Sequence, residues 1–274
     1  MREIAMATTE LRSAIWRTFW VNAVFAPRTS LGFMRLDFVL GTIFIIPFTQ
    51  MVFFAFVVSL SGSTAGVDYV VVGNAVATVT YSSIFSVCQT TDNEKEAGTM
   101  EHLLVSPANR FALYFGRGLI PIVTSLATVT VGLVYAVTIF HVPFDVSAWP
   151  ELAVSITLTA IAMVGFGLLL GGIALYLRTS IILGNIFLFV GLLLSGVNFP
   201  LSVLPVPLQY VGNALPLTWG LAAVRAALAG APLAQVLVLW GYVALEATAS
   251  LAIAIGLWKY FERRALATGS IARF

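Results

Sequence analysis

Long apolar stretches dominate this chain, and they restrict its fold more than any other feature. A helix that crosses a membrane needs about 20 consecutive apolar residues. The sequence contains six candidate stretches, at residues 38–60, 68–89, 115–140, 152–177, 181–197 and 233–258. The fifth is short, whereas the others are long enough to cross with some tilt. The pattern therefore predicts an all-α integral membrane protein with six transmembrane helices.

The composition supports this class of protein. Only 9% of the 274 residues are charged, against about 25% in a soluble globular domain. The net charge of +2 is too small to indicate a nucleic-acid partner. Cys88 is the single cysteine, so a disulfide within the chain is excluded, and we expect this thiol to be buried and unreactive.

The basic residues indicate the orientation of the spans. With six crossings, four segments share one side of the membrane: 1–37, 90–114, 178–180 and 259–274. Thirteen of the fourteen Lys and Arg residues lie on that side, counting Arg117 at a helix end, and Arg225 lies on the other. An excess of Lys and Arg marks the cytoplasmic side. We therefore expect a multi-pass protein of the cytoplasmic membrane, with both termini in the cytoplasm.

The segment before the first span, residues 9–27, has a helical pattern of its own. Leu11, Ile15 and Phe19 recur every four residues, with two arginines among them. This pattern predicts an amphipathic helix that lies on the inner membrane surface and ends at Pro27. As its role we favour a plain membrane anchor over a gate or a docking rim.

A polar island interrupts the apolar pattern at residues 90–114. Five charged residues fall within ten positions, from Asp92 to Glu101. Leu103 and Leu104 give the island a small apolar face. A short rigid helix of this kind fits a groove on a partner protein, and its acids can orient that partner. From these residues alone, a solvated loop is an equally good interpretation.

Capping signals predict that the island is helical rather than irregular. Thr91-x-x-Glu94 is a capping-box pattern, which predicts a helix start at Thr91. Gly98 can end that helix in the left-handed conformation. Thr99 can cap a second turn, and Ser106-Pro107 supplies a cap and a first-turn proline for a third helix. We expect the third helix to continue into the next span.

A second unusual stretch occupies residues 198–230. Pro200, Pro205, Pro207 and Pro216 forbid one continuous helix, yet the stretch is too apolar for an ordinary exposed loop. Irregular backbone at membrane depth is tolerated only inside protein or along a cavity. The sequence therefore predicts a helix–turn–helix that dips back into the outer leaflet of the membrane.

The second helix of this hairpin has an apolar stripe. Leu217, Leu221, Val224 and Leu228 follow one another at helical spacing, and Arg225 lies off the stripe. For the arginine we favour snorkelling to lipid headgroups or capping of a carbonyl over contact with a substrate.

Together the island and the hairpin resemble the ABC-2 type transporter permeases, the membrane subunits of one class of ATP-driven exporters. The island has the family's E-x-G-T-x-E-x-L-x-x-S-P-x-x-R segment between Glu96 and Arg110. The hairpin has its F-P-x-x-x-L-P and P-L-T-x-x-x-x-x-x-R patterns, formed by Phe199, Pro200, Leu204, Pro205, Pro216, Leu217, Thr218 and Arg225. The number and order of the spans agree as well, so the resemblance covers nearly the whole chain as a single transmembrane domain, 1–274.

The resemblance implies roles for both motifs. The island would be a coupling helix that docks in a groove of a cytoplasmic ATPase subunit, through Glu94, Glu96, Gly98, Thr99, Glu101, His102, Leu103, Leu104, Pro107 and Arg110. The hairpin would close the pathway on the outer side, through Phe199, Pro200, Leu204, Pro205, Pro216, Thr218 and Arg225. Two permease copies would pair around a central route, and we favour a second copy of this chain over a related chain.

The resemblance also implies an energy source outside this chain. The sequence has no G-x-x-x-x-G-K-[ST] loop and no metal-ligand pattern. We therefore expect no catalytic residue, cofactor or metal site here, and expect ATP and Mg to be bound by the partner subunit. Drug and antibiotic exporters of bacteria look most similar, which implies an amphipathic or lipid-like substrate. Export of a polysaccharide or lipid-linked glycan is the alternative, and a secondary transporter a distant one.

Polar residues inside two spans could face a translocation route. Glu246 lies near the middle of the sixth span, where a carboxylate costs about 2.5–3.5 kcal/mol. We slightly favour a neutral or hydrogen-bonded contact between helices, for example with Ser250, over a place on the route. Asn74, Thr78 and Ser82 share one face of the second span, where they could line the route or bond across helices.

Two further features predict local packing. Gly167-x-x-x-Gly171 in the fourth span permits close approach of another helix, which we interpret as structural. Pro47 and Gln50 are expected to kink and polarise the first span.

Overall fold

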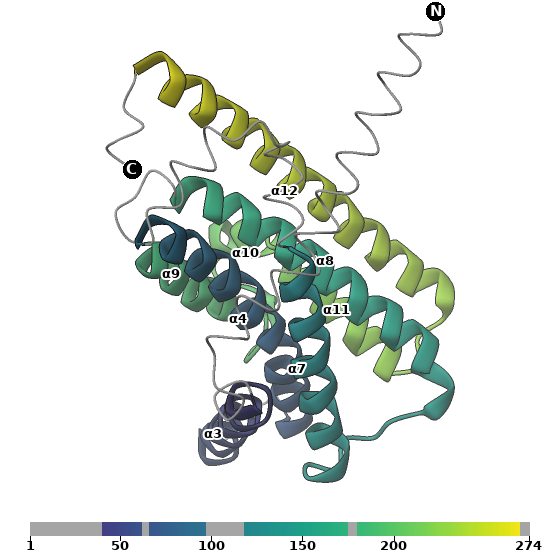
Figure 1. The fold of residues 1–274 in the computed structure, drawn as a ribbon. Coiled ribbons are helices and arrows are strands. Elements are labelled where there is room, and N and C mark those ends of the chain that lie inside the picture. The colour runs from purple at the N-terminus through teal and green to yellow at the C-terminus, as the bar shows by residue number, and fades with distance from the viewer. Residues whose placement is uncertain (1–39, 62–65, 97–117, 175–179, 269–274) are drawn as a thin grey trace, which may run out of the picture.

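The computed structural model describes residues 40–61, 66–96, 118–174 and 180–268. Every regular element in these ranges is helical, which confirms the all-α class for them (Figure 1). The elements are η1 (Gly41–Ile45), α3 (Ile46–Ser61), α4 (Val67–Glu96), α7 (Leu119–Thr138), η2 (Val146–Ala148), α8 (Trp149–Ala174), α9 (Ser180–Leu194), η3 (Leu201–Val203), α10 (Val206–Asn213), α11 (Pro216–Leu228) and α12 (Leu233–Thr268). The helix predicted at residues 9–27 lies outside the described residues.

Five helical stretches among the described residues are long and apolar enough to cross a membrane. They are Gly41–Leu60, Val67–Cys88, Leu119–Thr138, Trp149–Ile173 and Leu233–Tyr260. The stretch expected to form the fifth of six spans is a shorter apolar helix, Ile182–Leu194. Because this helix falls short of the length that a crossing requires, the sixth crossing stays a prediction.

The capping-box prediction at the start of the polar island is wrong. A helix start is expected at Thr91, but α4 continues without interruption through this position to Glu96. Neither glycine nor proline lies between Thr91 and Glu94, so nothing breaks the ladder of backbone hydrogen bonds. Extending an existing helix costs much less than nucleating a new one, so the capping pattern is overridden by its context.

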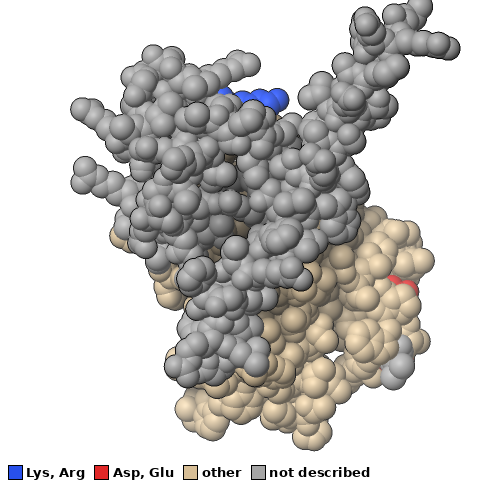
Figure 2. Space-filling model, in the orientation of Figure 1, with Lys and Arg blue, Asp and Glu red and all other residues tan. Residues whose placement is uncertain are grey.

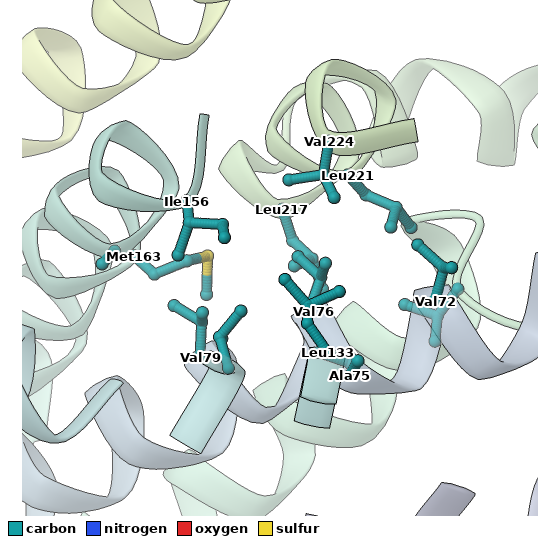
Figure 3. Packing of buried hydrophobic residues seen from close by; sticks show 14 of the residues in the cluster. Val72, Ala75, Val76, Val79, Leu133, Ile156, Met163, Leu217, Leu221 and Val224 are labelled. Carbon is teal, nitrogen blue, oxygen red and sulfur yellow. The ribbon is translucent and has the colours of Figure 1, made fainter. Parts of the chain in front are cut away.

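The helix α4 lies at the centre of the bundle, in contact with α3, α7, α8, α9 and α11. Its buried side chains meet those of α3, α7, α8 and α11 in one apolar cluster, part of which Figure 3 shows. The labelled residues of this cluster are Val72, Ala75, Val76, Val79, Leu133, Ile156, Met163, Leu217, Leu221 and Val224. The last three belong to the predicted stripe on α11, and Leu228 packs against the same cluster, which confirms that the stripe faces the core.

Of the five long apolar stretches, those of α3 and α12 are the least buried. Helix α12 packs against α8 and α11, whereas α3 packs against α4 and α7. Only 17% of the apolar window in the first span and 22% of that in α12 are buried within this single chain. The described surface in Figure 2 is nearly free of charge, with one red and one blue patch far apart. Such an apolar surface is suited to a lipid environment.

The first span begins with the π-helical turn η1, directly before α3. Pro47 is the second residue of α3. A proline has no N–H to donate and its ring collides with the preceding turn, and π-helical turns are a common way for a helix to accommodate such a defect. A wider helical turn thus lies directly before Pro47, while the predicted kink itself stays a prediction.

Close packing of α8 against α4 depends on a residue without a side chain. A Cβ atom at Gly167 would lie 3.0 Å from the carbonyl oxygen of Ser83. The neighbouring group is backbone in the middle of α4, so it cannot move aside as a flexible side chain would. This contact supports the structural interpretation of Gly167.

We therefore expect Gly167→Val to destabilise the fold by about 1–3 kcal/mol, the range for overpacking a filled interior. Gly256→Val on α12 is the matched control, because Gly256 is exposed and no described atom lies within 4 Å of the added Cβ. The buried thiol of Cys88 reports unfolding in detergent micelles, since it is the single cysteine of the chain. Equal midpoints of thermal thiol exposure for both variants would contradict this packing.

Candidate functional site: the hairpin and its arginine anchor

The segment predicted as a helix–turn–helix does contain two short helices, α10 and α11. The turn between them is held by two side chains of α11. The hydroxyl of Thr218 donates to the carbonyl of Gly212, and the indole Nε1–H of Trp219 donates to the carbonyl of Asn213 at 2.8 Å. Pro216 occupies the first turn of α11, where its missing N–H leaves no helical bond unmade. These contacts make the hairpin a defined unit.

The first pattern of the hairpin lies in the segment that leads from α9 to α10. Pro200 and Pro205 are extended residues that precede η3 and α10, so each proline permits a new helical turn to begin. Leu204 lies between them, and its carbonyl accepts a hydrogen bond from Gln209 at 2.8 Å. Phe199 is half-buried. The pattern F-P-x-x-x-L-P therefore shapes the entry to the hairpin.

Arg225 on α11 fastens this hairpin to the central helix. Its guanidinium donates to three backbone carbonyls: Gly196 at 2.9 Å, Tyr69 at 2.9 Å and Val197 at 3.1 Å. An arginine is always charged in proteins and carries five donors in a planar fork. Of the roles expected for Arg225, the structure shows the capping of carbonyls.

The ring of Tyr69 completes the arginine anchor, which we define as Arg225, Tyr69 and Gly196. The guanidinium carbon lies 3.4 Å from the centroid of this ring, in cation–π geometry. The hydroxyl of Tyr69 donates to the carbonyl of Gly196 at 2.9 Å. Gly196 has φ +73°, a conformation that glycine adopts at little cost. Arg225 and Tyr69 thus both donate a hydrogen bond to the carbonyl of Gly196.

Gly73 allows the connection between α9 and η3 to lie directly against α4. A Cβ atom at this position would collide with the carbonyl oxygen of Val197 and would lie 2.8 Å from a guanidinium nitrogen of Arg225. One turn separates Gly73 from Tyr69, so both lie on the same face of α4. The first turns of α4 therefore provide the surface against which Val197 and Arg225 pack.

A buried polar network lies beside the anchor. Asn74 is fully buried; its amide nitrogen donates to Asn198 at 2.8 Å, and its oxygen accepts from Gln50 at 3.0 Å. These bonds join α3, α4 and the entry to the hairpin. Ser82 bonds to Thr128 of α7 at 3.3 Å. Asn74 and Ser82 therefore bond across helices, which is one of the two roles considered for them.

Thr78 has a local partner. Its hydroxyl donates to the carbonyl of Ala75 at 2.7 Å, within α4, and the residue is 3% exposed. Asn74 and Thr78 are thus covered by protein in this conformation. A route that passes along them would require the core around α4 to open.

The predicted coupling residues fall at the far end of α4 and beyond it. The backbone of Glu94 and Glu96 belongs to the last turns of α4. The other residues expected to contact the ATPase, from Gly98 to Arg110, lie outside the described residues. The helix that carries Tyr69 and Gly73 near its start therefore leads to the polar island at its end.

Glu246 is half-buried on α12. Its Oε2 atom is covered by protein and makes no hydrogen bond, to Ser250 or to any other described residue. The contact with Ser250 that we considered is therefore not formed. A buried acceptor without a partner is costly, but the carboxyl group as a whole lies close to the indole of Trp219 on α11, which is a contact between helices.

Sequence reasoning missed Tyr69 and Gly73. Tyr69 is separated from Arg225 by 156 positions, and an aromatic residue near a helix end is ordinary in a membrane protein. Gly73 lies inside an apolar helix, where a glycine is also common. A weak signal was available, because a glycine and an asparagine stand side by side in an otherwise apolar span.

We expect Arg225→Ala to lower the free energy of unfolding by at least about 3 kcal/mol, because charge-assisted hydrogen bonds contribute about 1.5–3 kcal/mol each and a buried carbonyl would lose its donor. Arg225→Lys should retain only part of the lost free energy of unfolding, since an ammonium group lacks the planar fork of donors. Lys259→Ala is the control, a basic residue on the exposed surface of α12. Thermal exposure of Cys88 measures all three, and an Arg225→Ala midpoint equal to that of Lys259→Ala would argue against the anchor.

We expect Tyr69→Phe to cost about 1 kcal/mol, because it removes only the neutral hydrogen bond to Gly196. Tyr69→Leu removes the ring as well and should cost about 0.5–2 kcal/mol more. When Arg225 is replaced by alanine, the ring has no cation to contact, so the difference in stability between Tyr69→Phe and Tyr69→Leu should become smaller. A double-mutant cycle measures this change. A difference that persists unchanged would show that the ring contributes packing alone.

Comparison with known proteins agrees with this arrangement. The family model for the ABC-2 type transporter matches residues 22–229. Two curated relatives, both described as "Probable multidrug ABC transporter permease YbhR" and found in Escherichia coli K12 and Escherichia coli O157:H7, are each 28% identical over 116 residues. Those matches cover 42% of this chain but only 31% of the relatives' length. Because the family model spans the core, the arginine anchor and the hairpin, this chain belongs to the ABC-2 type transporter family.

Proposed function

We propose that this chain is the transmembrane permease subunit of an ABC exporter. It moves an amphipathic small molecule or a lipid-like substrate outward across the cytoplasmic membrane of a bacterium. A separate cytoplasmic subunit binds ATP and Mg and hydrolyses the ATP, and the permease itself has no catalytic residue. Two copies of the permease pair around the route. Each chain crosses the membrane six times, with both termini in the cytoplasm.

One observation carries this proposal: α4 connects the hairpin to the polar island as one uninterrupted helix. At 1.5 Å per residue, its 30 residues span about 45 Å, more than the hydrocarbon core of a bilayer, about 30 Å. The arginine anchor holds the hairpin at one end of this helix. The island begins at the other end. A displacement of the island therefore reaches the hairpin through a single rigid element.

The substrate class rests on several weaker observations. The apolar outer surfaces of α3 and α12 would let an apolar molecule approach from the lipid. The two matched relatives are described as multidrug permeases. Both points favour an amphipathic small molecule over a glycan as the substrate. A secondary transporter would need paired intramembrane charges, and Glu246 has no such partner among the described residues.

The coupling role is tested with the permease and its ATPase subunit produced together. Leu104→Ala should weaken binding of the ATPase about ten-fold, as loss of an apolar anchor at an interface costs more than 1 kcal/mol. Glu101→Gln should leave the complex intact but reduce transport per ATP hydrolysed. Co-purification and transport into inverted vesicles are the measurements.

Asp145→Asn is the matched control for Glu101→Gln. Asp145 is exposed, in the segment between α7 and α8, and accepts a hydrogen bond from the backbone of Ser147 at 2.9 Å. An asparagine retains this acceptor, so only the charge is removed. Transport that is normal in both Leu104→Ala and Glu101→Gln would place the coupling site elsewhere. Robust ATP hydrolysis by the isolated chain would refute the need for a separate ATPase.

A further inference from the structure

Three side chains with complementary chemistry meet between α11 and α12. The rings of Trp219 and Tyr242 are stacked, with centroids 4.4 Å apart and planes at 22°. Glu246 follows Tyr242 by four residues, so both side chains lie on the same face of α12. The carboxyl group of Glu246 lies close to the indole of Trp219. We call these three residues the aromatic–carboxylate cluster.

The aromatic part of the cluster is held firmly. Trp219 donates its indole N–H to the carbonyl of Asn213, and its ring packs against the buried group Ala162, Val243 and Ala247. The indole is therefore anchored to α10 on one side and to α8 and α12 on the other. A fixed aromatic face is a better binding surface than a mobile one, because less entropy is lost on binding.

The carboxyl group of the cluster has no counter-charge in the described part of the chain. Glu246 lies at the middle of the apolar stretch Leu233–Tyr260, and its buried Oε2 makes no hydrogen bond. Among the side chains that the structure describes, those of Arg225 and Lys259 are basic; Lys95, Arg263 and Arg264 are described by their backbone alone. Arg225 is bound to carbonyls and to Tyr69, and Lys259 lies about 20 Å further along α12, at 1.5 Å per residue.

These features select one chemical class of ligand. The face of an aromatic ring attracts a cation, most strongly for Trp and Tyr, and organic ammonium ions are bound in this way. A carboxylate without a counter-charge adds the negative charge that such a cation would neutralise. Tyr242 is 45% exposed and its neighbour Leu245 64% exposed, so the cluster reaches the apolar outer surface of α12. A ligand here must carry apolar groups as well as charge.

We propose that Trp219, Tyr242 and Glu246 form a binding site for an amphipathic organic cation. Assigning this ligand as the exported substrate rests on the proposed function, whereas the site itself rests on the cluster. The carboxylate pairs with the positive charge, the exposed ring of Tyr242, held in place by its stacking on Trp219, covers that charge, and the apolar groups of the ligand lie along the exposed surface of α12. The site requires no ATPase subunit for binding.

Two probes of the same shape and opposite charge test this site: tetraphenylphosphonium and tetraphenylborate. Binding of each is measured on the full chain in nanodiscs of phosphatidylcholine, a lipid without net charge. The wild-type chain should bind the phosphonium saturably and the borate much more weakly. Equal binding of both ions would overturn the proposal, since it would show an apolar surface without selectivity for charge.

Glu246→Gln keeps the shape of the side chain and should weaken phosphonium binding at least about ten-fold, as expected when an ion pair in a dry site is lost. Glu151→Gln is the control. Glu151 also has a buried Oε2 without a partner, but it lies in the first turn of α8, where the helix dipole stabilises its charge. An equal loss in both variants, or no loss in Glu246→Gln, would refute the site.

Tyr242→Leu tests the aromatic part, and we expect it to weaken phosphonium binding about three- to ten-fold. Tyr242 is preferable to Trp219 for this test, because Trp219 also holds the hairpin turn. Thermal exposure of Cys88 verifies that each variant is folded. Unchanged affinity in folded Tyr242→Leu would remove the aromatic contribution and contradict the proposal.

The outcomes separate this site from the proposed function. Selective phosphonium binding by a chain that fails to assemble with any ATPase would support the site and refute the exporter. A coupled complex that transports an amphipathic substrate but shows no difference between phosphonium and borate would support the exporter and refute the site.

Discussion

The carbonyl groups of Gly196 and Val197 must find hydrogen-bond donors within the protein, because both residues are buried and lie beyond the end of α9. Arg225 provides these donors. Its guanidinium reaches the carbonyls from α11 and at the same time covers the ring of Tyr69 on α4. The non-helical backbone between α9 and η3 therefore has its carbonyl groups satisfied only when α11, which carries Arg225, is folded back beside α4. The position of the hairpin, and with it the packing of Leu217, Leu221 and Val224, depends on this one cation.

The same cation explains why the residues around it are small or polar. Gly73 leaves room for the carbonyl of Val197, and Asn74 supplies bonds to both Gln50 and Asn198. An asparagine inside an apolar helix is costly unless its amide is satisfied. Here it joins three segments that are far apart in the sequence. Specific polar contacts of this kind fix one arrangement of helices, which apolar packing alone does less sharply.

Much of the architecture follows from the sequence because it depends on local patterns. Apolar runs of about 20 residues mark the helices, four prolines divide the hairpin, and helical spacing identifies the buried face of α11. Helix ends are less predictable. Thr91 and Glu94 match a capping box, but the same residues are tolerated inside a helix when no breaker separates them from it. The predicted end of this span, at residue 89, therefore comes before the observed end of α4 at Glu96.

The anchor and the aromatic–carboxylate cluster depend on contacts between distant residues, which leave no local pattern. Arg225 was expected to cap a carbonyl, yet nothing near it in the sequence points to Tyr69. Glu246 was visible as an isolated carboxylate in an apolar span. The stacking of Trp219 on Tyr242 was not, because it requires α11 and α12 to pack at one particular register. Such contacts depend on how the helices pack in three dimensions, and this packing cannot be inferred from local patterns in a single sequence.

The continuity of α4 has a mechanical consequence. With one end fixed by the arginine anchor, the helix is a lever about 40 Å long between Tyr69 and Glu96, at 1.5 Å per residue. Tilting such a rod by about 5° shifts its free end by about 3–4 Å, a distance comparable to the rearrangements that interfaces use to switch between two states. If the island moves as proposed, small rotations near the hairpin and angstrom-scale steps near the polar island are two measures of one motion, and the length of the helix sets the ratio between them.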